Sequence, residues 1–152
     1  MHVVLYKPEI PQNTGNIART CAVTKTTLHL IQPLGFSTSD RYLKRAGLDY
    51  WQYVTICYWR DINQLRQAYP DSNFYLFSVR GNKPYHLLSY DKSDFLVFGC
   101  ETSGLPDELL QSDWGDCIRI PMRTGLRSLN LSNAVALVLY EALRQQGFPE
   151  FT

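Results

Sequence analysis

The chain has 152 residues, of which 45% are hydrophobic and 19% charged, and its formal net charge at pH 7 is +1. This length and composition are typical of one globular domain, so we expect a single domain spanning residues 1–152. The near-neutral charge excludes a strong attraction of the whole protein to phosphates, and nucleic-acid binding would need a local basic patch.

Apolar segments that favour strands alternate with segments that favour helices, which predicts an α/β fold: a parallel sheet flanked by helices. In chain order, strands are expected at 2–6, 27–31, 53–58, 74–79, 95–98 and 117–120. Their nearly continuous hydrophobicity predicts burial on both faces. Helices are expected to begin near Asn13, near Ser39, at Asp61, at Pro106 and Asp107, and near Leu131, several of them behind a polar residue that can cap free N–H groups.

The last expected helix, about 131–146, is apolar on more than one side. One stripe is formed by Leu131, Ala134, Val135, Val138 and Ala142, and off it lie Ala136, Leu137 and Tyr140. This pattern indicates either a helix buried between the sheet and another helix, or a homodimer interface.

The cysteines and histidines form no group with metal-ligand spacing, so we expect no metal. The four cysteines lie far apart in apolar stretches, which favours reduced core residues in a cytoplasmic protein. His2 and His29, at strand positions, are interpreted as structural histidines. No stretch approaches about 18 consecutive apolar residues and the N-terminus lacks a signal-peptide pattern, so we expect neither secretion nor a membrane.

Three loops that follow expected strands, 78–81, 99–104 and 120–122, could form one pocket, because ligands gather at the carboxyl ends of parallel strands. Their glycines would let the backbone approach a flat ring, although each glycine alone could be a simple turn residue. Apolar side chains that could enclose an adenine are those of Phe77, Leu105, Ile120, Met122 and Leu129.

Polar residues near the expected helix starts are candidates for chemistry. Ser and Asn side chains between 127 and 134 meet free N–H groups at the start of the last helix, an arrangement that suits a polar cofactor. Asn13 and Arg19 lie nearly two turns apart on the first helix and could reach one substrate group. Glu101, just after an expected strand, is a further candidate. The alternatives are that Arg19 is only a solvated surface arginine and that Glu101 only caps a helix or ties down a loop.

Residues 41–45, Arg-Tyr-Leu-Lys-Arg, and 50–53, Tyr-Trp-Gln-Tyr, combine cations with aromatic rings. That composition suits phosphates and stacked single-stranded bases. An ordinary amphipathic surface explains it equally well.

Three motifs, in this order, resemble those of the SpoU-type branch of the SPOUT RNA methyltransferases: residues 8–19, 98–106 and 118–134. Within that branch, the chain is most similar to the minimal bacterial tRNA 2′-O-methyltransferases that act on the wobble nucleotide. The similarity is carried by Pro-Glu-Ile-Pro-Gln-Asn-Thr-Gly-Asn at 8–16, Arg-Ala-Gly-Leu-Asp-Tyr at 45–50 and Ser-Leu-Asn-Leu-Ser-Asn-Ala at 128–134.

The resemblance implies a C-terminal deep trefoil knot, an exception to the rule against knots. It also implies S-adenosylmethionine (AdoMet) as methyl donor, the anticodon stem-loop of tRNA as substrate, and a homodimer whose sites use both chains. The cofactor would be bound by Phe77, Ser78, Gly99, Glu101, Ile120, Met122, Ser128, Leu129 and Asn133. The catalytic residues would be Asn13, Arg19, Glu101, Ser128 and Asn130. RNA would be bound by Lys7, Arg41, Lys44, Arg45, Arg123 and Arg127.

Two residues depart from the family pattern: Cys100 stands where relatives often carry proline, and Ser103 where they often carry arginine. The missing cation at 103 would leave RNA contact near the site to Lys7, Arg123 or Arg127. For the in-line attack of a ribose 2′-hydroxyl on the methyl group, we expect Arg19 to grip the adjacent phosphate and orient the hydroxyl, because a guanidinium stays protonated.

The expected activity is therefore 2′-O-methylation of the wobble cytidine or modified uridine, with leucine tRNAs as expected targets. Three alternatives stay open: the same chemistry on another tRNA position or on ribosomal RNA, a non-catalytic AdoMet- or RNA-binding module, and a nucleotide-binding flavodoxin-like protein.

Overall fold

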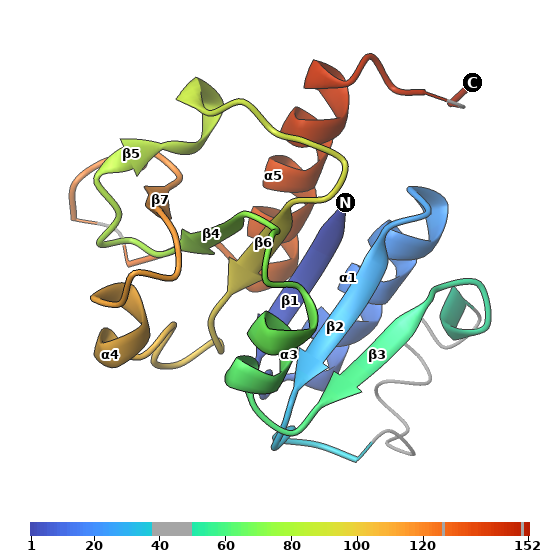
Figure 1. Cartoon of the computed structure of the whole chain (residues 1–152), viewed down its shortest axis with the longest axis horizontal. Helices are drawn as coiled ribbons and strands as arrows, with labels where there is room; N and C mark the ends of the chain where they lie inside the picture. Colours follow the sequence, from blue (N-terminus) through green and yellow to red (C-terminus); the bar gives the residue numbers. More distant parts are fainter. Residues whose placement is uncertain (38–49, 126, 150) are drawn as a thin grey trace.

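A computed structural model describes residues 1–37, 50–125, 127–149 and 151–152. Its seven-stranded sheet is parallel throughout, in the order β3-β2-β1-β6-β4-β7-β5 (Figure 1). The strands are β1 (His2–Tyr6), β2 (Thr27–Ile31), β3 (Ile56–Trp59), β4 (Phe74–Phe77), β5 (Lys83–Pro84), β6 (Phe95–Phe98) and β7 (Cys117–Arg119). The helices are α1 (Pro11–Val23), α3 (Ile62–Ala68), the 3-10 helix η1 (Tyr85–Leu87), α4 (Asp107–Leu110) and α5 (Leu131–Gln145).

The two faces of the sheet bury separate apolar clusters, as continuous hydrophobic strands require. On one face, α1 and α5 pack against alternate residues such as Val3 and Leu5. On the other, α3 and α4 cover Val4 and its neighbours. The predicted α/β architecture is therefore confirmed, and one continuous sheet supports the single domain, which itself stays a prediction.

The predicted strands at 2–6, 27–31 and 95–98 match the structure, but the bounds of the other three were wrong. The third strand begins at Ile56 instead of 53, because a turn in which the Tyr53 N–H donates to the Tyr50 carbonyl precedes it. The fourth ends at Phe77 instead of 79, because Ser78 starts a turn that Gly81 closes with a 3.1 Å bond. The sixth ends at Arg119 instead of 120.

Helix starts agree within two residues at α1, α3, α4 and α5. Asp61 caps α3 by accepting a hydrogen bond from the Gln64 N–H at 2.9 Å. The helix expected near Ser39 lies outside the described residues. None of the described helices is long and apolar enough to cross a membrane.

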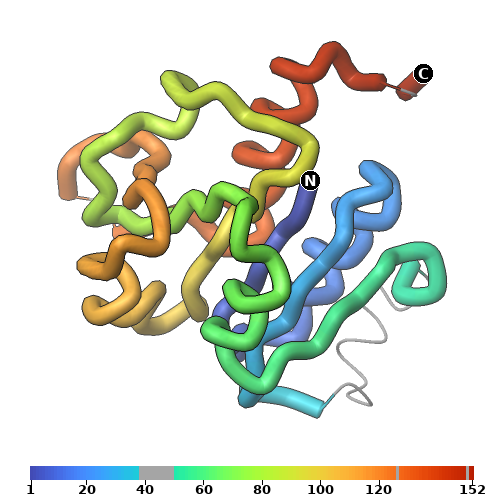
Figure 2. The backbone as a smooth tube through the Cα atoms, viewed as in Figure 1, coloured from blue at the N-terminus to red at the C-terminus, as the bar shows by residue number. Residues whose placement is uncertain are grey.

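The last strand, β7, inserts between the earlier strands β4 and β5. Figure 2 follows the chain from this orange segment to the red helix α5, which packs against α1. This return is where the resemblance places the knot, and the knot itself stays a prediction.

His2 and His29 form a neutral pair at the amino end of the sheet, which confirms their structural role. The Trp59 indole N–H donates to His29 Nδ1 at 2.9 Å, and His29 Nε2 lies 2.9 Å from His2 Nδ1. His29 thus carries its proton on Nε2 and donates it to His2. Burial lowers the pKa of His2 to about 4 and that of His29 to about 3.

Candidate functional site

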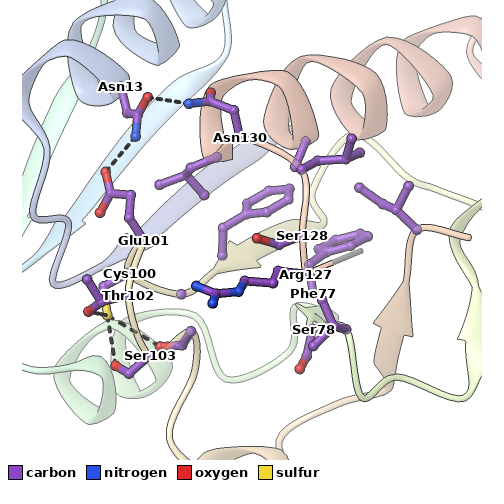
Figure 3. A pocket seen from close by; sticks show the side chains of 18 of the residues that line it. Asn13, Phe77, Ser78, Cys100, Glu101, Thr102, Ser103, Arg127, Ser128 and Asn130 are labelled. Carbon is purple, nitrogen blue, oxygen red and sulfur yellow. Dashed lines mark hydrogen bonds between the residues drawn. The ribbon is translucent and has the colours of Figure 1, made fainter. Parts of the chain in front are cut away.

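A cavity of about 780 Å³ opens where the carboxyl ends of β4, β6 and β7 meet the start of α5 (Figure 3). It is lined by segments 77–80, 98–104 and 127–131 together with Ile10, Asn13, Ile120, Met122 and Ala134. The three loops expected to form one pocket do so. Phe77 and Phe98, whose rings stack 4.7 Å apart, provide an apolar wall.

A chain of hydrogen bonds joins the three sequence motifs at one side of this cavity. The Asn13 side-chain amide donates to Glu101 Oε1 at 3.0 Å, and Asn130 Nδ2 donates to Asn13 Oδ1 at 3.0 Å (Figure 3). Asn130 Oδ1 in turn caps α5 by accepting from the Ser132 N–H at 2.9 Å. Asn13 is only 5% exposed, so both ends of its amide are used in a nearly dry position.

The loop before α1 and the loop after β6 also hold each other directly. The backbone N–H groups of Glu9 and Ile10 donate to the Glu101 carboxylate at 2.8 and 3.2 Å. In return, the Thr102 hydroxyl and N–H donate to the Glu9 carboxylate at 2.7 and 3.2 Å. Two reciprocal carboxylate contacts therefore fix the position of Glu101 beside the cavity.

Gly99 permits a close approach of the backbone at the floor of the cavity. A Cβ atom at this position would lie 2.0 Å from the carbonyl carbon of Gly104, so that no other residue fits without a shift. Gly104 itself has a φ of +71°, which favours glycine, and pairs with Cys100 in an antiparallel bridge. The Cys100 thiol lies 3.0 Å from the Ser103 hydroxyl, facing the same loop.

The residues expected to bind the cofactor all line the cavity except Asn133, which is exposed on the first turn of α5. Four expected catalytic residues line it as well: Asn13, Glu101, Ser128 and Asn130. Arg19 does not. Its guanidinium lies 4.7 Å from the ring centroid of Tyr50, exposed on another face of α1. The expectation that Asn13 and Arg19 of one chain could reach the same substrate group was therefore wrong: six residues turn a helix by about 240° beyond one full turn and place them on different faces.

Of the residues expected to bind RNA, Arg127 lines the cavity and extends across it (Figure 3). Lys7 and Arg123 are exposed and lie outside it. Arg41, Lys44 and Arg45 fall outside the described residues.

The cysteines are less buried than expected. Cys21 is fully buried, and burial raises its pKa to about 12. Cys57, Cys100 and Cys117 are only partly buried, and Cys100 lines the cavity. Among the described residues, no group of three or more His, Cys, Asp or Glu side chains could hold a metal ion.

Sequence reasoning missed Ile10, Leu131 and Ala134 as lining residues. All three belong to the sequence motifs, Ile10 just before α1 and the other two on α5, and only the packing of the two helices brings them to the cavity. Arg80 lies in the loop 78–81, which was expected to line the pocket. It forms an ion pair with Asp107, and this contact lowers the pKa of the Asp107 carboxyl.

Comparison with known proteins gives consistent results. The sequence model of the SpoU rRNA methylase family matches residues 1–140. The tRNA (cytidine(34)-2′-O)-methyltransferase of Escherichia coli (strain K12) is 44% identical over 150 residues, covering 98% of this chain and 96% of that protein. A solved structure described as "Structural insights into the 2-OH methylation of C/U34 on tRNA" superposes with a TM-score of 0.92 at 44% identity, covering 97% of this chain and 96% of that one.

An AdoMet-bound rRNA methyltransferase from Sinorhizobium meliloti superposes with a TM-score of 0.83 at 26% identity, covering 94% of this chain and 55% of that one. The family match extends over nearly the whole chain and includes the three motifs that meet at the cavity. The chain belongs to the SpoU family of RNA methyltransferases.

Proposed function

We propose that this protein transfers a methyl group from AdoMet to the ribose 2′-hydroxyl of nucleotide 34, a cytidine or modified uridine, in tRNA. Leucine tRNAs are the proposed targets and the cytoplasm the proposed compartment. The observation that carries the proposal is the hydrogen-bonded junction of Glu101, Asn13 and Asn130 beside the cavity. It occurs in a chain that is 44% identical to a tRNA (cytidine(34)-2′-O)-methyltransferase.

The cavity suits AdoMet in size and chemistry. Its volume of about 780 Å³ lies within the range of small-molecule sites. Apolar Phe77, Ile120 and Leu129 could enclose the adenine, while Gly99 lets the backbone of Gly104 and Leu105 pack closely beneath the cavity. AdoMet would supply an electrophilic methyl group on a positively charged sulfur.

The protein's own contribution would be mainly positioning. Glu101, Asn13 and Asn130 hold one another rigidly, so the segment from Ser128 to Asn130 is fixed where the ribose would lie. Arg19 does not reach the cavity of its own chain, and we propose that the partner subunit of a homodimer supplies it. There it would grip the phosphate next to the reacting ribose and orient the hydroxyl.

The first test is methyl transfer from labelled AdoMet to total tRNA from a strain that lacks this gene, followed by mass mapping of the modified nucleotide. A 2′-O-methylated nucleotide 34 is expected. Label on ribosomal RNA or at another tRNA position would reject the substrate. No transfer despite AdoMet binding would favour a sensing module.

Replacing Arg19 by lysine tests its role. Lysine keeps the charge but cannot grip a phosphate with two parallel N–H groups, so kcat should fall at least about tenfold. Nearly full turnover with unchanged RNA affinity would contradict the assignment.

A further inference from the structure

A second cavity, of about 370 Å³, opens at the same edge of the sheet, at the carboxyl ends of β1, β2 and β3. Its floor is apolar and buried, formed by Ile31, Ile62 and Leu109. Two partly buried aromatic side chains, Tyr6 and Trp114, also line it. An apolar floor with aromatic surfaces suits a flat, weakly polar ligand.

The charges at this cavity cancel. Arg60 donates to its neighbour Asp61 at 2.9 Å, and Lys7 and Glu108 complete the charged lining. Lys7 has no carboxylate partner within the described part of the chain, and its ammonium lies 5.2 Å from the ring centroid of Tyr6. The balanced charges favour an uncharged planar group over a free phosphate as the ligand. Among the described residues, Lys7 remains as the single unpaired cation at the rim.

The two cavities open at the same carboxyl edge of the sheet, and short chain segments connect them. Lys7 is two residues from Glu9, and Pro106, which lines the second cavity, is two residues from Gly104, which lines the first. The Thr102 hydroxyl and N–H both donate to the Glu9 carboxylate, so these two connecting segments are hydrogen-bonded to each other. A continuous strand with one nucleotide in the first cavity could therefore place a neighbour in the second.

We propose that the second cavity binds the base of a nucleotide adjacent to the methylated one in the RNA substrate. This inference rests on the proposed function. The base stacks against Trp114 and Tyr6, with the Lys7 ammonium beside the connecting phosphate. Loop nucleotides suit such binding because their bases can leave the stack and lie on aromatic side chains.

The test uses an anticodon stem-loop RNA and the full-length protein. Trp114→Ala should raise KM for the RNA about tenfold with little change in kcat, since stacking on one ring contributes about 1–3 kcal/mol per base. Trp114→Phe, which keeps a ring, should restore most of the affinity. AdoMet affinity should stay unchanged in both variants.

Because Trp114 also contacts Phe74, with ring centroids 6.1 Å apart, Lys7→Gln provides a second variant on an exposed side chain. It should raise KM for the RNA several-fold. The matched control is Lys92→Gln, the same change at the amino end of the sheet, where KM should not move.

An RNA with an abasic nucleotide next to the target identifies the ligand. When the abasic position is on the side that reaches the second cavity, the abasic RNA should bind wild-type protein as weakly as normal RNA binds the Trp114→Ala variant. The abasic RNA should bind the Trp114→Ala variant no more weakly than that. The inference is overturned if wild type methylates the RNA but neither abasic neighbour couples to Trp114. It is also overturned if Trp114→Ala weakens AdoMet and RNA binding equally. Absence of transfer by wild type would reject the proposed function and this inference with it.

Discussion

Glu101 is the side chain on which the junction of the three motifs depends. Its carboxylate accepts hydrogen bonds from the N–H groups of Glu9 and Ile10 and from the Asn13 amide. A glutamine can accept at one oxygen only and would turn its NH₂ group toward a donor. We expect Glu101→Gln to lower the free energy of unfolding by about 1–3 kcal/mol and to reduce methyl transfer strongly.

Urea denaturation with and without AdoMet measures this effect. Glu108→Gln is the matched control, because Glu108 is an exposed glutamate that accepts no hydrogen bond from the described residues. Equal stability of the two variants would show that the junction contributes nothing to folding.

The His2–His29 pair predicts acid sensitivity. Burial is the main cause of both lowered pKa values, and the positive charge of the N-terminus adds to it. The unfolded chain therefore binds more protons than the folded chain below about pH 6.5, so stability falls as pH decreases. We expect a loss on the order of 2 kcal/mol between pH 6.5 and 5, mostly from the buried His29, because solvent screens the half-buried His2.

Urea denaturation across this range checks the prediction. His2→Gln should flatten the dependence of stability on pH, whereas His86→Gln, at an exposed histidine, should leave it unchanged. A wild-type stability that is constant from pH 6.5 to 5 would contradict the buried neutral pair.

At the scale of elements, the start of α5 combines a helix cap with a site contact. Asn130 Oδ1 caps the helix, and its Nδ2 donates to Asn13. Asn130→Asp keeps the capping oxygen and adds a charge favourable at a helix N-terminus, but it loses the donor. We expect this change to cost about 1–3 kcal/mol of stability, because the buried Asn13 oxygen loses its donor, and to weaken methyl transfer at least about tenfold. Asn130→Ala should also lose about 0.5–2 kcal/mol of stability. Parallel thermal unfolding and transfer assays separate the two roles.

Elements with a strong apolar signal were predictable, and those defined by long-range pairing were not. β6 is a continuous apolar run and β1 and β2 are largely apolar, so their boundaries follow from the residues. β5 is a two-residue edge strand, Lys83–Pro84, and it is defined by its pairing with β7 and not by an apolar pattern of its own. In the site, the strand-end loops were predictable from their polar and glycine residues. The hydrogen bond from Thr102 to the Glu9 carboxylate joins residues 93 positions apart, which no local pattern encodes.

At the scale of the whole molecule, an exposed apolar surface supports the predicted homodimer. Leu137 and Tyr140 on α5 are 37% and 43% exposed, and they are two of the three residues that lie off the buried stripe. The double variant Leu137→Glu, Tyr140→Glu should fold normally, because neither side chain is in the core. It should not dimerise, because two charges would replace the apolar surface. Sedimentation should show monomers that bind AdoMet and transfer no methyl group. The control, Leu87→Glu, places the same charge on a 72% exposed leucine of η1 and should remain dimeric.

A mixed dimer tests whether each site is shared between subunits. Arg19 lies away from the cavity of its own chain, whereas Asn130 lines it. If Arg19 acts on the partner's cavity, a dimer of one Arg19→Ala chain and one Asn130→Asp chain contains one intact site and one doubly altered site. Co-expression of the two inactive variants should then restore activity to roughly a quarter of the wild-type level, because about half of the dimers are mixed and each has one working site of two. If Arg19 acts within its own chain, every site in the mixture carries one defect and activity stays at the level of the single variants.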